Sequence, residues 1–373
     1  MRILLACDKF KGSLSAADAS AAIAAGLLRA DPAHDVVIVP VADGGDGTLD
    51  AAYAAGFQRV PCTVTGPTGS PVRTSFGRRG DLAVVELADA CGLARLPDGR
   101  PAPLTASSRG LGEVLNAALA TAATHIIIGV GGSASTDGGM GMLAALGVAF
   151  RDAAGRPVPE GGGALAAIAA VDLTGLPPRA RDVDWVLASD VANPLLGEHG
   201  CAHVFAPQKG ADPEQVAVLE AGLAAYARLL VEATGRDLRA ATGAGAAGGV
   251  GFAALTVLRA RRRPGIDVVL DWSDFATALT TADLVITGEG CLDRQTLLGK
   301  ARAGIAEAAR AAGVPVIAIC GRNELTRADL ARLGISRAYA LADLEPDPAR
   351  SFAQAPRLLT VLGEEVGRGW AAR

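Results

Sequence analysis

Short, continuous runs of apolar residues alternate along the chain with longer stretches in which apolar positions recur at a helical spacing. The short runs are rich in Val, Ile and Leu, which is typical of strands buried on both faces of a parallel sheet. The longer stretches are rich in alanine and predict helices with one buried face. The pattern predicts strands at residues 3–7, 36–41, 82–87, 125–130, 183–189, 284–287, 314–320 and 337–341, and helices at 16–29, 48–55, 108–123, 138–146, 213–233, 300–312, 327–333 and 355–365.

The alternation of strands and helices predicts an α/β fold with mainly parallel sheets. Both ends of the chain show regular β-α order, while the segment between them has longer loops and more glycine. We therefore predict two domains. The first is doubly wound (flavodoxin- or Rossmann-like) and discontinuous, from residues 1–62 and 280–373, and the second is an inserted α/β domain, 63–279, with the active site in the cleft between them. A tandem division near residue 150 is the alternative.

Composition and charge exclude several classes of protein. The chain has 373 residues and a net charge of −4, which argues against a general nucleic-acid binder. Its six cysteines are scattered without a CxxC pair, and this fits a reducing cytoplasm. Asp8 and Lys9 interrupt the first apolar run, so we expect neither a signal peptide nor a membrane partner.

A carboxylate follows the carboxyl end of five predicted strands, at Asp8, Asp43, Asp137, Asp190 and Glu289. Ligands of open parallel sheets bind beyond these strand ends. Glycine-rich segments there let backbone N–H groups approach phosphate oxygens. The same residue types also make turns and helix caps, so each segment singly has a structural explanation. Their recurrence at five strand ends favours a ligand site.

The polar residues in these segments suit the binding of phosphate and a divalent cation. Lysines supply positive charge to phosphate, and carboxylates hold Mg²⁺ together with phosphate and water. Arg109, near a predicted helix start, is able to grip a substrate carboxylate, although a surface arginine is an equal explanation. The candidate lysines are Lys9, Lys11, Lys209 and Lys300, and the candidate Mg²⁺ ligands are Asp43, Asp46, Glu289 and Asp293.

Familiar nucleotide and hydrolase motifs do not explain this chain. It contains no GxxxxGK[ST], which excludes a P-loop, and no GxSxG. One GxGxxG spans residues 243–248, but no predicted strand precedes it, so an NAD site is not favoured. His199 and His203 are four residues apart, yet the neighbouring glycines argue against a helical metal site.

Taken together and in order, the polar segments resemble the bacterial glycerate kinase family that makes 2-phosphoglycerate. No one of them is diagnostic, and the resemblance runs from residue 3 to about residue 320. The segments are DKFKGSLSA (8–16), PVADGGDGT (40–48), GPTG (66–69), SSRGLGE (107–113), GVGGSASTDGGMGM (129–142), SDVANPLLGEHG (189–200), FAPQKGA (205–211), GAGAAGG (243–249) and DLVITGEGCLDRQTLLGKA (283–301).

The resemblance implies ATP and Mg²⁺ as cosubstrates, D-glycerate as acceptor and two α/β domains, one of them discontinuous. We expect Asp190 to be the base, with Asp293 second, and Lys11 and Lys300 to neutralise phosphate charge. The expected glycerate contacts are Ser108, Arg109, Ser133, Thr136, Asp137 and Asn193. The expected ATP contacts are Asp8, Lys9, Gly12, Ser13, Gly131, Gly132, Gln208, Lys209, Gly288, Gln295 and Thr296, and the expected Mg²⁺ residues are Asp43, Asp46 and Glu289.

The chain departs from the family's usual residues at three positions: Thr136 replaces Asn, Asp46 replaces Glu and Ser189 replaces Cys. We expect these changes to affect the fine geometry of substrate binding and not the class of reaction. Alternative functions are a kinase of another small hydroxy acid, a nucleotide or anion sensor without catalysis, and an NAD-linked oxidoreductase. The preference for the 2-hydroxyl rests on the resemblance alone. Monomer and homodimer are both left open.

Overall fold

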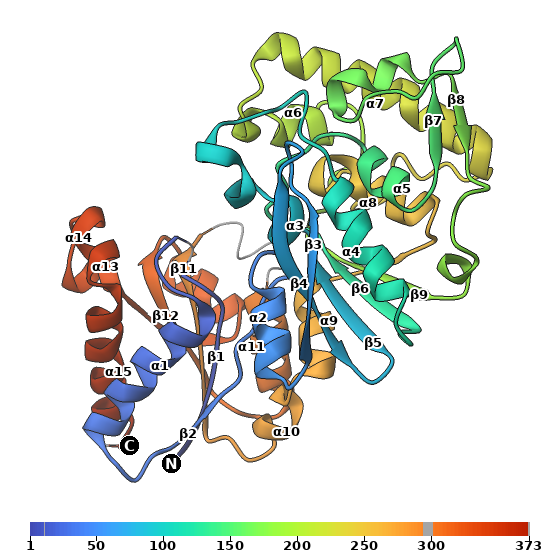
Figure 1. Ribbon diagram of the computed structural model, residues 1–373. Helices are drawn as coiled ribbons and strands as arrows, with labels where there is room; N and C mark the ends of the chain where they lie inside the picture. Colours follow the sequence, from blue (N-terminus) through green and yellow to red (C-terminus); the bar gives the residue numbers. More distant parts are fainter. Residues whose placement is uncertain (11, 294–300, 372–373) are drawn as a thin grey trace. The chain divides into compact units, whose positions relative to one another are not determined.

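The computed structural model describes residues 1–10, 12–293 and 301–371 (Figure 1). The chain forms two compact units. Unit 1 contains Met1–Asp43, Asp50–Ala55 and Gly265–Arg373, and unit 2 contains Gly44–Leu49 and Gly56–Pro264. The domain boundaries predicted after residues 62 and 279 stay a prediction.

Unit 1 is built on a five-stranded parallel sheet of order β13-β12-β11-β1-β2. Its central strands are continuous apolar runs that are buried on both faces, as their sequence predicts. The strands are β1 (Arg2–Cys7), β2 (Asp35–Ile38), β11 (Leu284–Leu292), β12 (Val316–Asn323) and β13 (Ile335–Ala340). The helices are α1 (Ala16–Ala30), α9 (Gly265–Trp272), α10 (Phe275–Leu279), α11 (Ala301–Ala311), α12 (Arg327–Arg332), α13 (Leu341–Leu344), α14 (Pro348–Ala353) and α15 (Ala355–Ala371), while α2 (Thr48–Ala54) begins in unit 2 and ends in unit 1.

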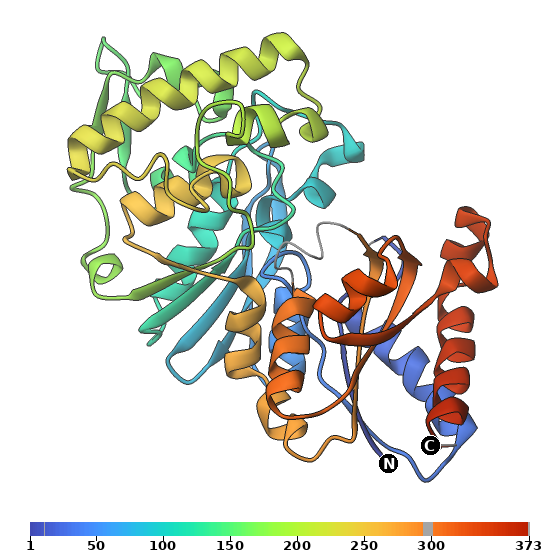
Figure 2. The same cartoon turned by 180° about the vertical axis from the view of Figure 1, so that it is seen from behind.

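Helices α1 and α15 lie side by side in both views of unit 1 (Figures 1 and 2). Ser15 starts α1, because its side chain accepts a hydrogen bond from the backbone N–H of Asp18 at 3.0 Å. The apolar faces of the two helices form one core with the sheet, which includes Ile23, Leu359 and Ile3.

Unit 2 is built on a mixed six-stranded sheet of order β10-β9-β6-β5-β4-β3. The strands β10, β9, β6 and β5 are parallel, and β4 and β3 add an antiparallel meander. The strands are β3 (Gln58–Thr65), β4 (Pro71–Arg79), β5 (Leu82–Glu86), β6 (His125–Gly129), β9 (Asp184–Ala188) and β10 (Arg261–Arg263), with β7 (Ala149–Arg151) and β8 (Ala170–Asp172) as a separate pair. The α-helices are α3 (Leu87–Cys91), α4 (Arg109–Leu119), α5 (Met140–Ala145), α6 (Cys201–Phe205), α7 (Pro213–Thr234) and α8 (Ala246–Thr256), and the 3₁₀ turns are η1 (Leu93–Arg95), η2 (Pro97–Gly99), η3 (Gly162–Ala167), η4 (Pro178–Arg181) and η5 (Pro207–Lys209).

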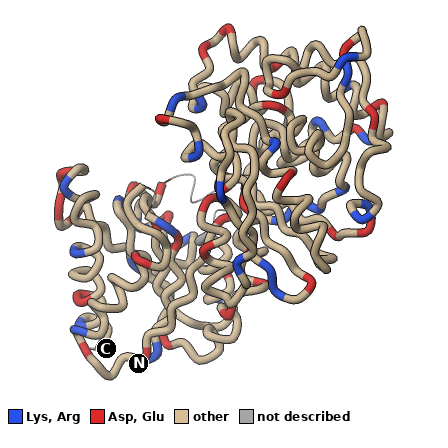
Figure 3. The backbone as a smooth tube through the Cα atoms, viewed as in Figure 1, with Lys and Arg blue, Asp and Glu red and all other residues tan. Residues whose placement is uncertain are grey.

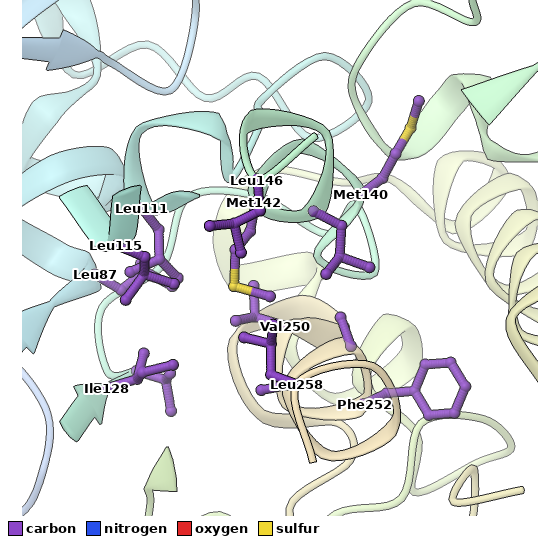
Figure 4. Close-up of a cluster of buried hydrophobic side chains, with 14 of the residues drawn as sticks. Leu87, Leu111, Leu115, Ile128, Met140, Met142, Leu146, Val250, Phe252 and Leu258 are labelled. Carbon is purple, nitrogen blue, oxygen red and sulfur yellow. The ribbon is translucent and has the colours of Figure 1, made fainter. Parts of the chain in front are cut away.

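The core of unit 2 joins the sheet to helices α4, α5 and α8 (Figure 4). Ile128 of β6, Leu111 of α4 and Val250 of α8 all belong to this cluster, and each is fully buried. Met142 of α5 lies in the same cluster, where its unbranched side chain packs among the other apolar side chains. Burial of this cluster fixes the loops at the carboxyl ends of the strands.

The predicted α/β class with mainly parallel sheets is confirmed, and the eight predicted strands all appear with shifted ends. The prediction missed the β3–β4 hairpin, β10 and the helices between residues 246 and 279. Positively and negatively charged residues are interspersed along the chain of both units (Figure 3). Within the described ranges, no helix is both long enough and apolar enough to cross a bilayer.

Candidate active site

The carboxyl ends of β1 and β11 form a topological switch point in unit 1. The chain runs from β1 outward to β2, and from β11 in the opposite direction to β12 and β13. Asp8 follows β1 at this point, Glu289 lies in β11, and the Asp8 N–H donates to the Gly288 carbonyl at 2.8 Å. Gly288 permits close strand packing, because a Cβ there would lie 2.6 Å from the Ile319 carbonyl oxygen. A pair of carboxylates therefore lies where open parallel sheets bind ligands.

The loop after β1 is held by contacts within unit 1. The Lys9 N–H donates to Asp8 Oδ1 at 2.7 Å, and Ser13 Oγ donates to the carbonyl of Phe352 in α14 at 3.2 Å. Gly12 has a φ of +78°, a left-handed conformation that favours glycine. The structure thus explains the shape of this loop, and ATP contacts from Asp8, Lys9, Gly12 and Ser13 stay predictions.

In unit 2, the strands β5, β6 and β9 end at one edge of the sheet, where Glu86 is in register with Gly129 and Gly129 with Ala188. The segment Gly44–Leu49 forms a turn that lies against this edge. Both carboxylate oxygens of Glu86 accept hydrogen bonds from it: Oε1 from the N–H of Gly47 at 3.1 Å, and Oε2 from the N–H of Leu49 at 2.9 Å. Glu86 thereby joins this turn to the sheet.

Two glycines, one at the end of β6 and one just beyond it, allow the same turn to approach. A Cβ on Gly131 would lie 2.4 Å from the Cα of Gly45, and a Cβ on Gly129 would lie 2.8 Å from the carbonyl oxygen of Gly44. Gly132 has a φ of +69° and is exposed beside Asp46, which is also exposed. The expected phosphate contacts of Gly131 and Gly132 stay predictions, but packing alone explains why residue 131 is glycine.

Sequence reasoning missed Glu86. Burial raises the pKa of its carboxyl to about 7, the two backbone N–H groups act in the opposite direction, and Asp46 and Asp89 add to the increase. A signal was present, because a carboxylate at the end of the apolar run Leu82–Glu86 requires a buried polar partner. The sequence could not show that this partner lies about 40 residues earlier.

The glycine-rich loop between β6 and α5 is organised by Asp137, which is fully buried. Asp137 Oδ2 accepts hydrogen bonds from the N–H and the hydroxyl of Ser108, each at 2.8 Å, and from the N–H of Gly141 at 3.2 Å. Its Oδ1 accepts from the N–H of Gly139 at 3.1 Å, and Ser108 Oγ accepts from the N–H of Met142 at 2.9 Å. The carboxylate therefore joins the amino-terminal ends of α4 and α5.

This environment gives Asp137 a positioning role within unit 2. Burial raises the pKa of its carboxyl, while the four hydrogen bonds act in the opposite direction. Thr136 is likewise fully buried, and Ser133 nearly so. Direct contact of glycerate with Ser108, Ser133, Thr136 or Asp137 stays a prediction, and the observed contacts provide a structural role for Ser108 and Asp137.

Lys209 lies beneath the same loop with 3% of its surface exposed. Its ammonium donates to Ser133 Oγ at 2.7 Å and to the Ser135 carbonyl at 2.5 Å. Burial lowers the pKa of this ammonium to about 8. The ionisable groups that act in the opposite direction are Cys201, Asp137 and Cys91. The structure thus shows Lys209 holding the loop, and its contact with ATP stays a prediction.

Arg109, the predicted clamp for the substrate carboxylate, is engaged by protein carboxylates. Its Nε donates to Glu160 Oε1 at 2.6 Å, a second nitrogen also contacts Glu160, and Nη1 lies 3.7 Å from Glu113. The Glu160 hydrogen bond raises the pKa of the guanidinium. Arg109 borders a cavity of about 510 Å³, which is lined by apolar side chains such as Phe150 together with Arg151 and Glu160. Its binding of glycerate stays a prediction that requires an exchange of partners.

The loop after β9 carries Asp190, which is partly buried, and Asn193. Asn193 Nδ2 donates to the His199 carbonyl at 2.8 Å, and the backbone carbonyl of Asn193 accepts a hydrogen bond from the N–H of Gly245 at 2.9 Å. Gln208 is exposed in η5. The glycines of the GxGxxG segment pack against this loop and the β6–α5 loop, since a Cβ on Gly245 would lie 2.3 Å from the Pro194 carbonyl oxygen. Close packing explains that segment.

Four predicted residues lie outside the described residues: Lys11, Gln295, Thr296 and Lys300. Asp43, Asp46, Glu289 and Asp293 are described, and all four offer the hard oxygen ligands that suit Mg²⁺. In the part of the chain that the structure describes, no three His, Cys, Asp or Glu side chains are grouped to hold a metal.

Comparison with known proteins decides the family. The sequence profile of the glycerate kinase family matches residues 3–371, which include every strand end described above. The chain belongs to the glycerate kinase family. Membership makes the protein a kinase, and it confirms the resemblance that the ordered polar segments predicted.

Several known glycerate kinases match this chain over most of their own length. A glycerate kinase of Bacillus subtilis (strain 168) is 46% identical over 86% of this chain and 85% of its own. A glycerate 2-kinase of Escherichia coli (strain K12) is 42% identical over 86% of this chain and 85% of its own. The crystal structure of a candidate glycerate kinase 2 from Salmonella typhimurium LT2 is 37% identical and superposes with a TM-score of 0.85, covering 100% of this chain and 98% of the other.

Proposed function

We propose that this protein transfers the γ-phosphoryl group of ATP to the 2-hydroxyl of D-glycerate with the help of Mg²⁺. The observation that carries this proposal is the match to the family over residues 3–371, with relatives named glycerate kinase and glycerate 2-kinase. The geometry supports it, because Asp8 and Glu289 lie at the β1 and β11 strand ends of unit 1, Asp190 follows β9 in unit 2, and Asp46 lies on the turn that Glu86 joins to the unit 2 sheet. The cytoplasm is the expected compartment.

Phosphoryl transfer requires orientation and neutralisation of charge more than covalent chemistry from the protein. In the proposed reaction, the glycerate hydroxyl oxygen forms a bond to the γ-phosphorus while the bond to the ADP oxygen breaks. The hydroxyl proton passes to Asp190, a carboxylate at the carboxyl edge of the unit 2 sheet. Asp293 is the second candidate for this base.

Asp43, Asp46 and Glu289 are the residues that would hold Mg²⁺, which when bound neutralises charge on the transferred phosphoryl group. Glu289 lies in β11, Asp43 lies in the segment that follows β2, and Asp46 is exposed on the turn that Glu86 holds. Lys9 is the described lysine nearest in sequence to Asp8 and would contribute positive charge toward phosphate.

Asp190→Asn tests the proposed base. General-base catalysis typically contributes roughly 10²–10⁴-fold, so kcat for glycerate should fall by that factor with little change in KM. The assay is ADP release with ATP and D-glycerate, with the phosphorylated carbon identified by NMR. Asp184→Asn is the matched control, because Asp184 lies at the amino end of the same strand and pairs with Arg261.

The outcomes separate the assignments. Loss of kcat in Asp190→Asn but not in Asp184→Asn supports Asp190 as the base. Loss in Asp293→Asn with full activity in Asp190→Asn moves the role to Asp293. A wild-type protein that phosphorylates another small hydroxy acid but not glycerate would overturn the substrate, and one that consumes no ATP with any of them would overturn the proposed function.

A further inference from the structure

The turn Gly44–Leu49 is fixed from two sides within unit 2. On one side, Glu86 accepts hydrogen bonds from the N–H groups of Gly47 and Leu49. On the other side, the backbone of Gly45 fills the space that a side chain on Gly131 would need. The hydrogen bonds from Glu86 hold the backbone that follows Asp46, and the contact with Gly131 holds the backbone that precedes it. The two contacts are independent of each other.

The turn also has its own internal support. Gly44 and Gly47 have φ values of +80° and +99°, so the chain reverses direction at positions that favour glycine. Thr48 is buried, and its hydroxyl donates to the Gly45 carbonyl at 2.6 Å. Asp46 lies between Gly44 and Gly47, and this residue is exposed.

We propose that Glu86 is a positioning residue that fixes Asp46 for binding the divalent cation. The inference rests on the proposed function, in which Asp46 is a Mg²⁺ ligand. Glu86 does not take the cation itself, because both of its oxygens accept backbone hydrogen bonds and 5% of the residue is exposed. Its role is to hold the backbone from which Asp46 projects.

Residues that orient metal ligands typically contribute roughly 10–100-fold to metal affinity. Glu86→Ala leaves the N–H groups of Gly47 and Leu49 without their acceptor, so the turn gains alternative conformations. We therefore expect Glu86→Ala to raise the Mg²⁺ concentration for half-maximal activity about tenfold. The KM for glycerate should stay within about twofold of the wild-type value, because a change confined to the cation site does not alter the contacts that bind glycerate. Glu86→Gln keeps one acceptor and should fall between wild type and Glu86→Ala.

Glu113→Ala is the matched control. Glu113 also uses two carboxylate oxygens to join two segments of unit 2, accepting from the N–H of Thr65 at 2.6 Å and from its hydroxyl at 2.9 Å. It makes none of the contacts with the Gly44–Leu49 turn that Glu86 makes. Its loss should lower the thermal unfolding midpoint without changing the Mg²⁺ requirement.

A second measurement does not depend on activity. Hydrogen–deuterium exchange of the metal-free protein should show faster exchange across Gly44–Leu49 in Glu86→Ala and wild-type exchange there in Glu113→Ala. In an Asp46→Ala background, adding Glu86→Ala should cause no further change in the Mg²⁺ requirement.

The results distinguish this inference from the proposed function. A wild-type Mg²⁺ requirement and wild-type exchange in Glu86→Ala, with only a lower unfolding midpoint, would overturn the positioning role. If Glu86→Ala does not fold, Glu86→Gln decides by the same two measurements. If the wild-type protein has no glycerate kinase activity, the proposed function fails, and exchange across the turn still shows whether Glu86 fixes it.

Discussion

Asp137→Ala is the substitution for which the structure and the sequence pattern make opposite predictions. The resemblance to the family implies that Asp137 contacts the substrate, and in that case its loss would raise the KM for glycerate. In the structure, its carboxylate is fully buried and accepts four hydrogen bonds from Ser108, Gly139 and Gly141. We therefore expect a loss of stability in unit 2.

The magnitude follows from the donors that the substitution leaves unpaired. Each buried donor without an acceptor costs about 1–3 kcal/mol. Four donors at about 1 kcal/mol each give about 4 kcal/mol, a large part of the stability of an ordinary domain. Removal of a carboxylate whose pKa burial has raised recovers some desolvation energy, so we use the lower value for each donor.

The assay must report on unit 2 alone, because two units need not unfold together. Trp185 provides this signal: it is buried in unit 2, and its indole N–H donates to the Ala180 carbonyl at 2.8 Å. The other two tryptophans, Trp272 and Trp370, lie in unit 1 and are replaced by phenylalanine in the reporter background. Urea unfolding followed by Trp185 fluorescence then gives the free energy of unfolding of unit 2.

Two further variants make the reasoning refutable. Asp137→Asn can keep three of the four hydrogen bonds on one oxygen, so it should cost less than Asp137→Ala. Ser108→Ala removes one donor to Asp137 and the acceptor for the Met142 N–H, and should cost about 1–3 kcal/mol. An Asp137→Ala protein with wild-type unfolding and a raised KM for glycerate would show that Asp137 is a substrate ligand and that our reasoning is wrong.

Two more predictions concern the same edge of unit 2. Burial lowers the pKa of Lys209 from 10.5 to about 8, so the folded protein releases this proton more readily than the unfolded chain. The lysine should therefore make stability rise by up to about 3 kcal/mol between about pH 8 and pH 10.5, and Lys209→Met should abolish that rise in urea titrations across this range. Gly131→Ala would place a Cβ 2.4 Å from the Gly45 Cα, so it should cost about 1–3 kcal/mol and raise the Mg²⁺ requirement through Asp46. Gly369→Ala is the control, because a Cβ there has no neighbour within 4 Å; it should leave the stability and the Mg²⁺ requirement unchanged.

The sequence predicted those elements whose signal is local. The central strands of both sheets are continuous apolar runs, and the helices predicted at 16–29 and 213–233 appear as α1 and α7, which the structure shows to be capped by Ser15 and Asp212. The hairpin of β3 and β4 was missed because its strands are half-exposed and mixed in character, and β3 contains Pro61. Proline is tolerated there because β3 is the edge strand of the sheet.

Helix α8 was missed for a different reason. It is buried on nearly all sides, so its sequence shows no alternation of apolar and polar faces. Its first residues Ala247, Gly248 and Gly249 also have positive φ values. No periodic pattern is available in such a segment, and the choice between helix and loop is made by tertiary packing.

The hydrogen-bond partners of the candidate site residues could not be predicted from the sequence. Motifs located Asp137 and Lys209, yet their partners Ser108 and Ser133 lie 29 and 76 residues away in the sequence. Glu86 was missed altogether, because nothing local shows which backbone groups will meet its carboxylate. Side-chain roles at strand ends depend on which loops the fold brings together, and a single sequence does not contain that information.

Glycine-rich loops at strand ends are usually taken to leave room for phosphate, and in unit 2 that inference is too broad. A Cβ would meet the Gly45 backbone at Gly131, the Arg109 backbone at Gly141, and the Ser135 backbone at Gly248. These glycines let one loop pack against another, and it is this packing that brings Asp46 and Gly132 to the exposed edge. Gly132 is the exposed glycine of the β6–α5 loop, with a left-handed backbone and no protein backbone atom among the neighbours its Cβ would meet. If phosphate binds this loop through a backbone N–H, the structure favours Gly132, and the remaining glycines act by holding that group in place.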